Sequence, residues 1–411
     1  MFSDILKSEP VSRAKLEAGV QDGSIVLVRN ENRDIAPLAI GTGVFTKINA
    51  NVGTSPKQDD ISLELEKCRV AVEAGADTVM DLSVGKNIDQ VRKRILKEVK
   101  VPVGTVPLYQ MFTGRKCEDV EFDDMLDVVE KQARDGVDFM TLHCGITLDL
   151  VKKSRRRLIP ITSRGGSLMA AWMLSNDCEN PLYTGFDSLL EILKEHDVVL
   201  SLGDALRPGA TADASDDVQF GELKNLGRLT KAARKKGVQV IIEGPGHVPL
   251  NQIELNVRME KELCGGAPFY VLGPLVCDVG VGHDHITGAI GGAIAAMQGA
   301  DFLCYVTPSE HLGLPGVEDV RNGVIASKIA AHAADMVKLG TTEKDNEMSK
   351  ARRRLDWKTM FKLELDKNIK KRYPELENKH ECTMCGEYCA LKAVEKQHEQ
   401  ELGSDALGSC L

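Results

Sequence analysis

Three cysteine residues lie close together near the C-terminus of the chain, as Cys382, Cys385 and Cys389. A structural zinc site takes four ligands, so these three thiolates cannot complete one by themselves. Three thiolates do suit a 4Fe-4S cluster whose fourth iron stays open to a substrate, which is how radical enzymes bind S-adenosylmethionine. The triplet therefore predicts a redox enzyme that carries a 4Fe-4S cluster and uses S-adenosylmethionine.

A fourth thiolate, Cys410, follows the triplet and would allow a four-thiolate zinc knuckle or a closed cluster instead. Its neighbours are Gly403, Ser404, Gly408 and Ser409. A tail of this composition is more typical of a frayed chain end than of a metal ligand. The open three-cysteine cluster is therefore favoured, and the four-thiolate sites are the alternative.

Two histidines and a carboxylate form a second set of candidate groups. Glu243 and His247 share the turn Glu-Gly-Pro-Gly-His, and His311 ends the string Ser-Glu-His after another predicted strand. Two imidazoles placed in this way can share one zinc or ferrous ion, with water or substrate at the remaining positions. Two histidines so distant in the sequence more often have no common metal, so spacing alone leaves this site open.

Arginine stands beside glycines in the segments 163–166 and 204–209. A guanidinium group with exposed backbone amides is a common phosphate site, and it is also a common structural loop. The basic stretch 152–157 also has two interpretations. It is either a segment that helps to bind a phosphate or, as is more frequent on an acidic protein, a solvated helix face.

The elements that must position these groups alternate along the chain. Short β-branched runs predict strands at 46–51, 78–82, 101–106, 139–143, 198–202, 238–243, 269–272 and 302–306. Amphipathic segments predict helices at 62–74, 88–97, 123–135, 187–195 and 223–236. Strands separated by helices predict a (β/α)8 barrel. An open doubly wound sheet is the alternative, with residues 159–162 as an additional strand.

Several polar side chains fall at the C-terminal ends of the predicted strands. They are Asn51, His143, Asp204, Glu243 and His247, and the apolar residue Met80 lies at the same level. This end of a (β/α)8 barrel carries the chemistry, so their placement favours a functional role over a role in the core.

The pattern changes after Leu312. Residues 319–338 predict a long helix, 341–354 are highly charged, and 357–373 predict another helix before the cysteine triplet. We therefore expect three parts: an N-terminal segment 1–40, a catalytic barrel 41–340 and a helical C-terminal domain 341–411 that carries the cluster.

Composition sets the outer limits of function. The chain has 411 residues, 43% of them hydrophobic, and a formal net charge of −9. An acidic protein of this kind argues against a nucleic-acid partner. No apolar run approaches the length of a membrane span, and the first residues lack the pattern of a signal peptide. The expected compartment is the cytoplasm, where the eleven cysteines remain thiols or ligands.

The chain resembles a known family from residue 41 to residue 391. The stretches that carry the resemblance are 49–55, 76–83, 103–110, 163–166, 243–249, 267–275, 304–315 and 382–389. They are similar to the phosphomethylpyrimidine synthase family of thiamine biosynthesis. The resemblance implies a (β/α)8 barrel, a homodimer and radical S-adenosylmethionine chemistry on 5-aminoimidazole ribotide. It also implies an electron donor such as flavodoxin or ferredoxin.

The resemblance implies roles for individual residues. The implied substrate contacts are Asn51, Met80, Tyr109, His143, Ser163, Arg164, Gly165, Asp204, Ala205, Leu206, Arg207, Glu243 and Tyr270. His247 and His311 are the implied ligands of a zinc ion, or of iron at the same site, and Cys382, Cys385 and Cys389 hold the 4Fe-4S cluster. Glu243 is a candidate general acid/base. Cys304 is a candidate hydrogen-atom relay, although a buried cysteine at a strand end is more often simply packed.

Two departures from the family pattern bear on the product. This chain has Ala205 where the thiamine enzymes have glycine, and His283 where they have tyrosine. An imidazole in place of a phenol changes shape and proton chemistry, which makes His283 a third catalytic candidate. The cysteine motif is also one residue shorter than in the long branch of the family.

These departures favour a paralogous branch, 5-hydroxybenzimidazole synthase. That branch uses the same ribotide to make the lower-ligand precursor for anaerobic cobalamin biosynthesis. The alternative is the thiamine enzyme, which makes 4-amino-5-hydroxymethyl-2-methylpyrimidine phosphate. A more remote alternative is a non-catalytic regulator that binds a nucleotide or a metal.

Overall fold

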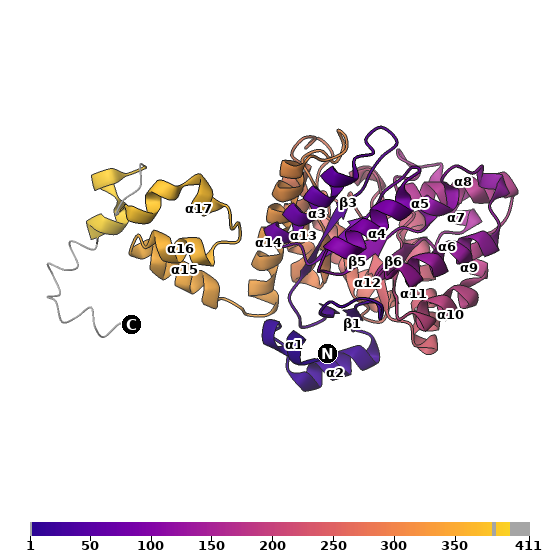
Figure 1. The fold of residues 1–411 in the computed structure, drawn as a ribbon, viewed down its shortest axis with the longest axis horizontal. Coiled ribbons are helices and arrows are strands. Elements are labelled where there is room, and N and C mark those ends of the chain that lie inside the picture. The colour runs from indigo at the N-terminus through magenta and orange to yellow at the C-terminus, as the bar shows by residue number, and fades with distance from the viewer. Residues whose placement is uncertain (1, 380–383, 395–411) are drawn as a thin grey trace. The chain divides into compact units, whose positions relative to one another are not determined.

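The structure, a computed structural model, describes residues 2–379 and 384–394 (Figure 1). It divides into two compact units, Met1–Gly340 and Thr341–Leu411, and each is described by itself. Within the described residues, no helix has the length and apolar character needed to cross a membrane.

Eight parallel strands form a closed barrel in the first unit. They are β3 (Lys47–Val52), β4 (Thr78–Asp81), β5 (Val103–Thr105), β6 (Phe139–Leu142), β7 (Val199–Leu202), β8 (Val240–Glu243), β9 (Phe269–Leu272) and β10 (Phe302–Cys304). Each strand pairs with the next one along the chain, and β10 closes the ring by pairing with both β9 and β3. Every predicted strand is present, and the predicted (β/α)8 barrel is confirmed.

The alternative of an open doubly wound sheet is wrong because the sheet closes. Residues 159–162 form turn and loop rather than a strand. The Asp213 carboxylate accepts hydrogen bonds from the backbone N–H groups of Leu158 and Ile159, both at 3.0 Å. A side chain therefore satisfies donors that a strand would offer to a neighbouring strand.

Helices surround the barrel and connect its strands (Figure 1). They are α3 (Ile61–Ala74), α4 (Ile88–Glu98), α5 (Leu108–Phe112), α6 (Phe122–Asp135), α7 (Leu148–Ser154), α8 (Arg164–Asn176), α9 (Pro181–Thr184), α10 (Phe186–Glu195), α11 (Asp217–Lys236), α12 (Ile253–Leu263), α13 (Asp284–Gln298) and α14 (Val317–Lys338). Their ends have local causes. Helix α3, for example, begins where Asp60 accepts hydrogen bonds from two backbone amides, and it ends at Gly75 with φ of 103°.

The N-terminal segment folds onto the barrel. It contains α1 (Phe2–Ser8), α2 (Arg13–Asp22) and an antiparallel hairpin of β1 (Ile25–Val28) and β2 (Leu38–Gly41). The side chain of Gln239, just before β8, exchanges two hydrogen bonds with the backbone of Leu27, at 2.7 and 3.2 Å. The hairpin therefore lies at the N-terminal ends of the strands, and the opposite end of the barrel stays available for chemistry.

The second unit is helical in its described part. It contains α15 (Glu343–Arg353), α16 (Trp357–Leu363) and α17 (Ile369–Arg372). The helical stretch predicted over 357–373 is present, but it breaks after Leu363 into two helices. The Asp366 carboxylate accepts a hydrogen bond from the backbone N–H of Asn368 at 3.0 Å, and this local turn replaces a helical turn.

Candidate active site

One cavity gathers most of the predicted substrate contacts at the C-terminal end of the barrel. The predicted residues among those that line it are Asn51, Met80, Tyr109, His143, Ser163, Arg207, Glu243, Tyr270 and Cys304. Asn51, Glu243, Tyr270 and Cys304 belong to strands β3, β8, β9 and β10, which lie next to one another in the barrel. Rigid strands therefore hold the chemical groups, and loops complete the wall.

A carboxylate and a guanidinium group face each other in this cavity. The Glu243 Oε2 atom accepts a hydrogen bond from the backbone N–H of Asp204 at 3.0 Å and lies 3.7 Å from Arg207 Nη1. Burial raises the pKa of Glu243, and the positive charge of Arg207 offsets part of that rise. A buried carboxyl group with a raised pKa suits proton transfer near neutral pH.

His143 is neutral in this site. Its Nε2 atom is hydrogen-bonded to Ser163 Oγ at 3.0 Å, and its Nδ1 atom has no hydrogen-bond partner among the described residues. Burial, together with the nearby charge of Arg207, lowers the pKa of His143 to about 3. A Cβ atom at Gly165 would lie 2.3 Å from His143 Cε1, so glycine is needed beside this ring. The free Nδ1 atom can therefore bond to a polar group of a ligand.

The N-terminus of α8 offers a site for an anion. Ser163 caps this helix, because its hydroxyl oxygen accepts a hydrogen bond from the N–H of Gly166 at 3.1 Å. The guanidinium carbon of Arg164 lies 5.1 Å from the centre of the Tyr109 ring, and Arg164 lines a second cavity that shares Asn51 with the first. A helix N-terminus flanked by arginine favours a phosphate group.

The thiol of Cys304 belongs to a polar cluster. The Asn51 Nδ2 atom donates to Cys304 Sγ at 3.1 Å, and Asn49 Nδ2 donates to the hydroxyl oxygen of Tyr270 at 2.7 Å. Burial raises the pKa of Cys304 to about 12. The group is therefore a thiol at neutral pH, which suits hydrogen-atom donation better than attack by a thiolate.

His247 and His311 lie side by side, with ring centres 5.2 Å apart. The Nδ1 atom of His247 pairs with Asp278 Oδ1 at 2.8 Å, and that of His311 pairs with Asp284 Oδ1 at 3.0 Å. Each ring therefore has its Nε2 atom available, in the tautomer that a metal ligand needs. The sequence did not identify either aspartate, because contacts between residues about thirty positions apart leave no mark in local spacing.

The spacing of the two rings fits one shared ion. An imidazole bound through Nε2 at a usual zinc distance has its ring centre about 3.2 Å from the ion, so two rings at a tetrahedral angle have centres about 5.2 Å apart. The observed separation is 5.2 Å. The described residues contain no group of three or more metal-ligating side chains, so the remaining positions would fall to water or substrate.

Six residues with a predicted substrate or catalytic role do not line the main cavity: Arg164, Gly165, Asp204, Ala205, Leu206 and His283. Asp204 lines a small cavity behind Glu243, and Ala205 and Leu206 are fully buried. His283 is exposed where α13 begins and lines none of the cavities described here. The structure thus separates His283 from Glu243 and Cys304, the other two catalytic candidates.

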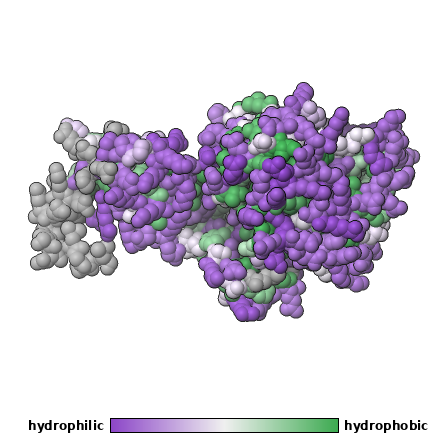
Figure 2. All heavy atoms as spheres, viewed as in Figure 1, coloured by the Kyte–Doolittle hydropathy of each residue, from purple (hydrophilic) through white to green (hydrophobic). Residues whose placement is uncertain are grey.

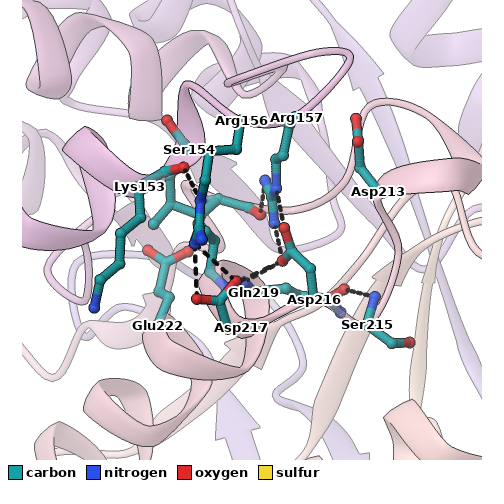
Figure 3. Close-up of polar contacts among 12 residues, drawn as sticks. Lys153, Ser154, Arg156, Arg157, Asp213, Ser215, Asp216, Asp217, Gln219 and Glu222 are labelled. Atoms are coloured by element: carbon teal, nitrogen blue, oxygen red, sulfur yellow. Dashed lines mark hydrogen bonds and ion pairs between the residues drawn. The ribbon is translucent and has the colours of Figure 1, made fainter.

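The basic stretch 152–157 does not face the cavity as a phosphate site. Arg157 forms two hydrogen bonds with Asp216, both at 2.7 Å, and donates a third to the backbone oxygen of Leu206 at 2.7 Å. Arg156 pairs with Asp217 (Figure 3). Arg157 therefore joins the loop after β7 to the start of α11, and Arg156 also binds the start of α11.

Two of the three predicted cluster ligands lie in the described part of the second unit. Cys385 is exposed and Cys389 is partly buried, and both are free thiols. The backbone N–H of Tyr388 donates to the carbonyl oxygen of Cys385 at 3.0 Å, so one tight turn carries both cysteines. Cys382 lies outside the described residues, as does Cys410.

The fold and the motifs together define a radical S-adenosylmethionine enzyme built on a barrel. The model of the Radical SAM ThiC family matches residues 1–396, and the chain belongs to this family. Membership implies a 4Fe-4S cluster and S-adenosylmethionine, as the cysteine triplet predicts.

Named relatives of this chain align with almost its whole length. A protein of Desulfotalea psychrophila is 52% identical over 97% of this chain and 95% of its own length. One of Desulforudis audaxviator is 55% identical over 92% and 90%, and one of Methanocaldococcus jannaschii is 51% identical over 95% of both. All three are named phosphomethylpyrimidine synthase. The resemblance found in the sequence is confirmed at the level of the family.

Proposed function

We propose that this protein is a phosphomethylpyrimidine synthase that converts 5-aminoimidazole ribotide into the pyrimidine phosphate of thiamine. The observation that carries the proposal is the name shared by relatives at 51–55% identity over at least 90% of each chain. The relatives therefore support the alternative product better than the benzimidazole that the departures in the sequence favoured.

The positions of those departures support the same choice. Ala205 is fully buried against α8, where a Cβ atom on Gly166 would lie 2.8 Å from the Ala205 methyl group. His283 is exposed and outside the cavity. Neither residue changes the surface that a ribotide would meet in the main cavity, so neither gives a reason for a different product.

Different residues of the cavity have different roles toward the ribotide. Arg207, Arg164 and the N-terminus of α8 bind the phosphate, and His143 and Asn51 orient the ribose and aminoimidazole. When bound, the 4Fe-4S cluster supplies the electron that cleaves S-adenosylmethionine to a 5′-deoxyadenosyl radical. Glu243 moves protons during the rearrangement, and the buried wall keeps water away from radical carbon atoms.

Product analysis tests the proposal directly. The protein is reconstituted anaerobically with iron and sulfide and is then incubated with 5-aminoimidazole ribotide, S-adenosylmethionine and dithionite. We expect a pyrimidine phosphate. A benzimidazole would overturn the proposal in favour of the cobalamin branch, and a protein that makes neither product nor 5′-deoxyadenosine would be the non-catalytic binder.

We further propose that His247 and His311 hold a zinc or ferrous ion, oriented by Asp278 and Asp284. Asp278→Asn removes a carboxylate that orients His247, so we expect the affinity for zinc to fall about 10–100-fold. Competition with a chromophoric chelator measures this without any turnover.

The matched control for this metal prediction is Asp149→Asn. Asp149 is an exposed surface residue that pairs with Lys153. This variant should bind zinc as the wild type does. Equal zinc affinity in both variants would contradict the assigned role of Asp278.

The partners complete the proposal. We propose a flavodoxin or ferredoxin as electron donor, a cytoplasmic setting and a homodimer. Figure 2 shows apolar side chains that interrupt the polar surface of the barrel unit. On α13, Ile286 and Ile290 are about half exposed and lie one helical turn apart, which supports a second copy of the chain as partner. Sedimentation velocity measures the oligomeric state.

A further inference from the structure

A pair of buried carboxyl groups lies behind the main cavity. Glu222 is on α11, near Asp216 and Asp217 at the start of that helix (Figure 3). It is fully buried, and its oxygens accept hydrogen bonds from the backbone N–H groups of Ala205 at 3.1 Å and Leu206 at 2.6 Å. Asp204, which is 5% exposed, is on the loop that these amides belong to, and its carboxyl group is an electrostatic neighbour of Glu222.

The cationic side chains near this pair are bound to other groups. Arg157 is paired with Asp216 and with the backbone oxygen of Leu206, and Arg207 is directed to the backbone oxygen of Asp204 and to Glu243. Within the part of the chain that the structure describes, no ion pair joins a cation to the carboxyl group of Asp204 or Glu222. The charged or titratable groups that face the pair are Arg157, Arg207, Glu243 and Cys144.

Two carboxyl groups in contact inside a protein do not both ionise, because two negative charges would be buried side by side. Burial raises the pKa of Asp204 to about 7. Burial, together with the neighbouring charge of Asp204, raises the pKa of Glu222 well above its ordinary value.

We propose that Asp204 and Glu222 share one proton and that Glu222 is a positioning residue for the substrate site. Glu222 holds the loop 204–207 through two backbone amides, and this loop places Arg207 and supplies the N–H group bound to Glu243. Loss of the shared proton adds a second negative charge beside this loop. The inference rests on the proposed function only for the identity of the ligand, 5-aminoimidazole ribotide.

The shared proton has a signature in stability that needs no ligand. Carboxyl groups whose pKa is raised in the folded state stabilise the protein below their unfolded pKa, and this stability is lost as the pH rises through the folded pKa. We therefore expect the unfolding temperature to fall by about 2–4 °C between pH 5.5 and 8.5 on account of the pair. Asp204→Asn keeps a hydrogen-bond donor toward Glu222 at every pH, so this variant should lose that part of the pH dependence. An unchanged pH dependence in Asp204→Asn would overturn the shared proton.

Calorimetric titration with 5-aminoimidazole ribotide tests the positioning role. Glu222→Ala removes the acceptor for two loop amides, and we expect binding at least tenfold weaker at pH 6. Glu222→Gln retains one acceptor and should restore binding to within about threefold of the wild type. Wild-type affinity in Glu222→Ala, or no recovery in Glu222→Gln, would overturn the role of Glu222.

The control is a second buried glutamate. Glu260 on α12 is fully buried, and burial raises its pKa to about 8, but it lies outside the cavity. Glu260→Gln should leave the affinity for the ribotide unchanged. If the wild type itself does not bind the ribotide, the proposed function fails, while the unfolding temperatures still decide whether the proton is shared.

Discussion

Replacement of Cys389 by alanine is expected to abolish both cleavage of S-adenosylmethionine and product formation. A 4Fe-4S cluster with an open iron has three protein thiolates, and with two of them it has no stable attachment. The variant should hold little iron or sulfide after reconstitution, and it should give no cluster signal in electron paramagnetic resonance after reduction. Production of 5′-deoxyadenosine should fall to the level of a blank without protein.

The control for this loss is Cys178→Ala. Cys178 is an exposed free cysteine in the barrel unit, after α8 and outside the triplet. This variant should keep the iron content and the activity of the wild type. If Cys389→Ala also retained a full cluster, another cysteine would have to be the third ligand, and Cys410 would be the first candidate.

The barrel could be predicted because its strands have a clear local pattern. Strands such as β7 (Val199–Leu202) are covered by helices on one side and by the barrel interior on the other, so all four residues of β7 are buried and three of them are apolar. Glycines such as Gly75, Gly136 and Gly237 mark helix ends with positive φ angles. The hairpin β1–β2 was missed, because short strands in a segment with few other signals resemble loops.

The candidate site was predictable only in part. The groups at strand ends came together because the barrel brings all its C-terminal ends to one face. The partners that orient these groups were missed, since Glu222, Asp278 and Asp284 make contacts that depend on tertiary structure. His283 is the opposite case, because it was expected in the site and lies outside it. Its place in the sequence suggested the cavity, but the start of α13 holds it at the surface.

The substitution Glu243→Gln is expected to lower turnover by about 10²–10⁴-fold while the protein still binds the ribotide. The amide oxygen of glutamine can accept the hydrogen bond from the backbone N–H of Asp204, so the loop geometry is retained. The amide cannot exchange a proton, so the steps that need a general acid/base slow. Single-turnover measurements should show that 5′-deoxyadenosine still forms while the pyrimidine product does not.

The pH dependence separates a lost proton carrier from a damaged fold. Burial raises the pKa of Glu243, so the wild-type rate should change with pH as this carboxyl group ionises, and that limb of the profile should disappear in Glu243→Gln. Glu260→Gln makes the same chemical change in a buried glutamate outside the cavity, and it should keep both the rate and the limb. A Glu243→Gln variant with the wild-type rate would mean that another group moves the protons. Since burial and Arg207 keep His143 neutral, the next candidate for that group is the pair of Asp204 and Glu222.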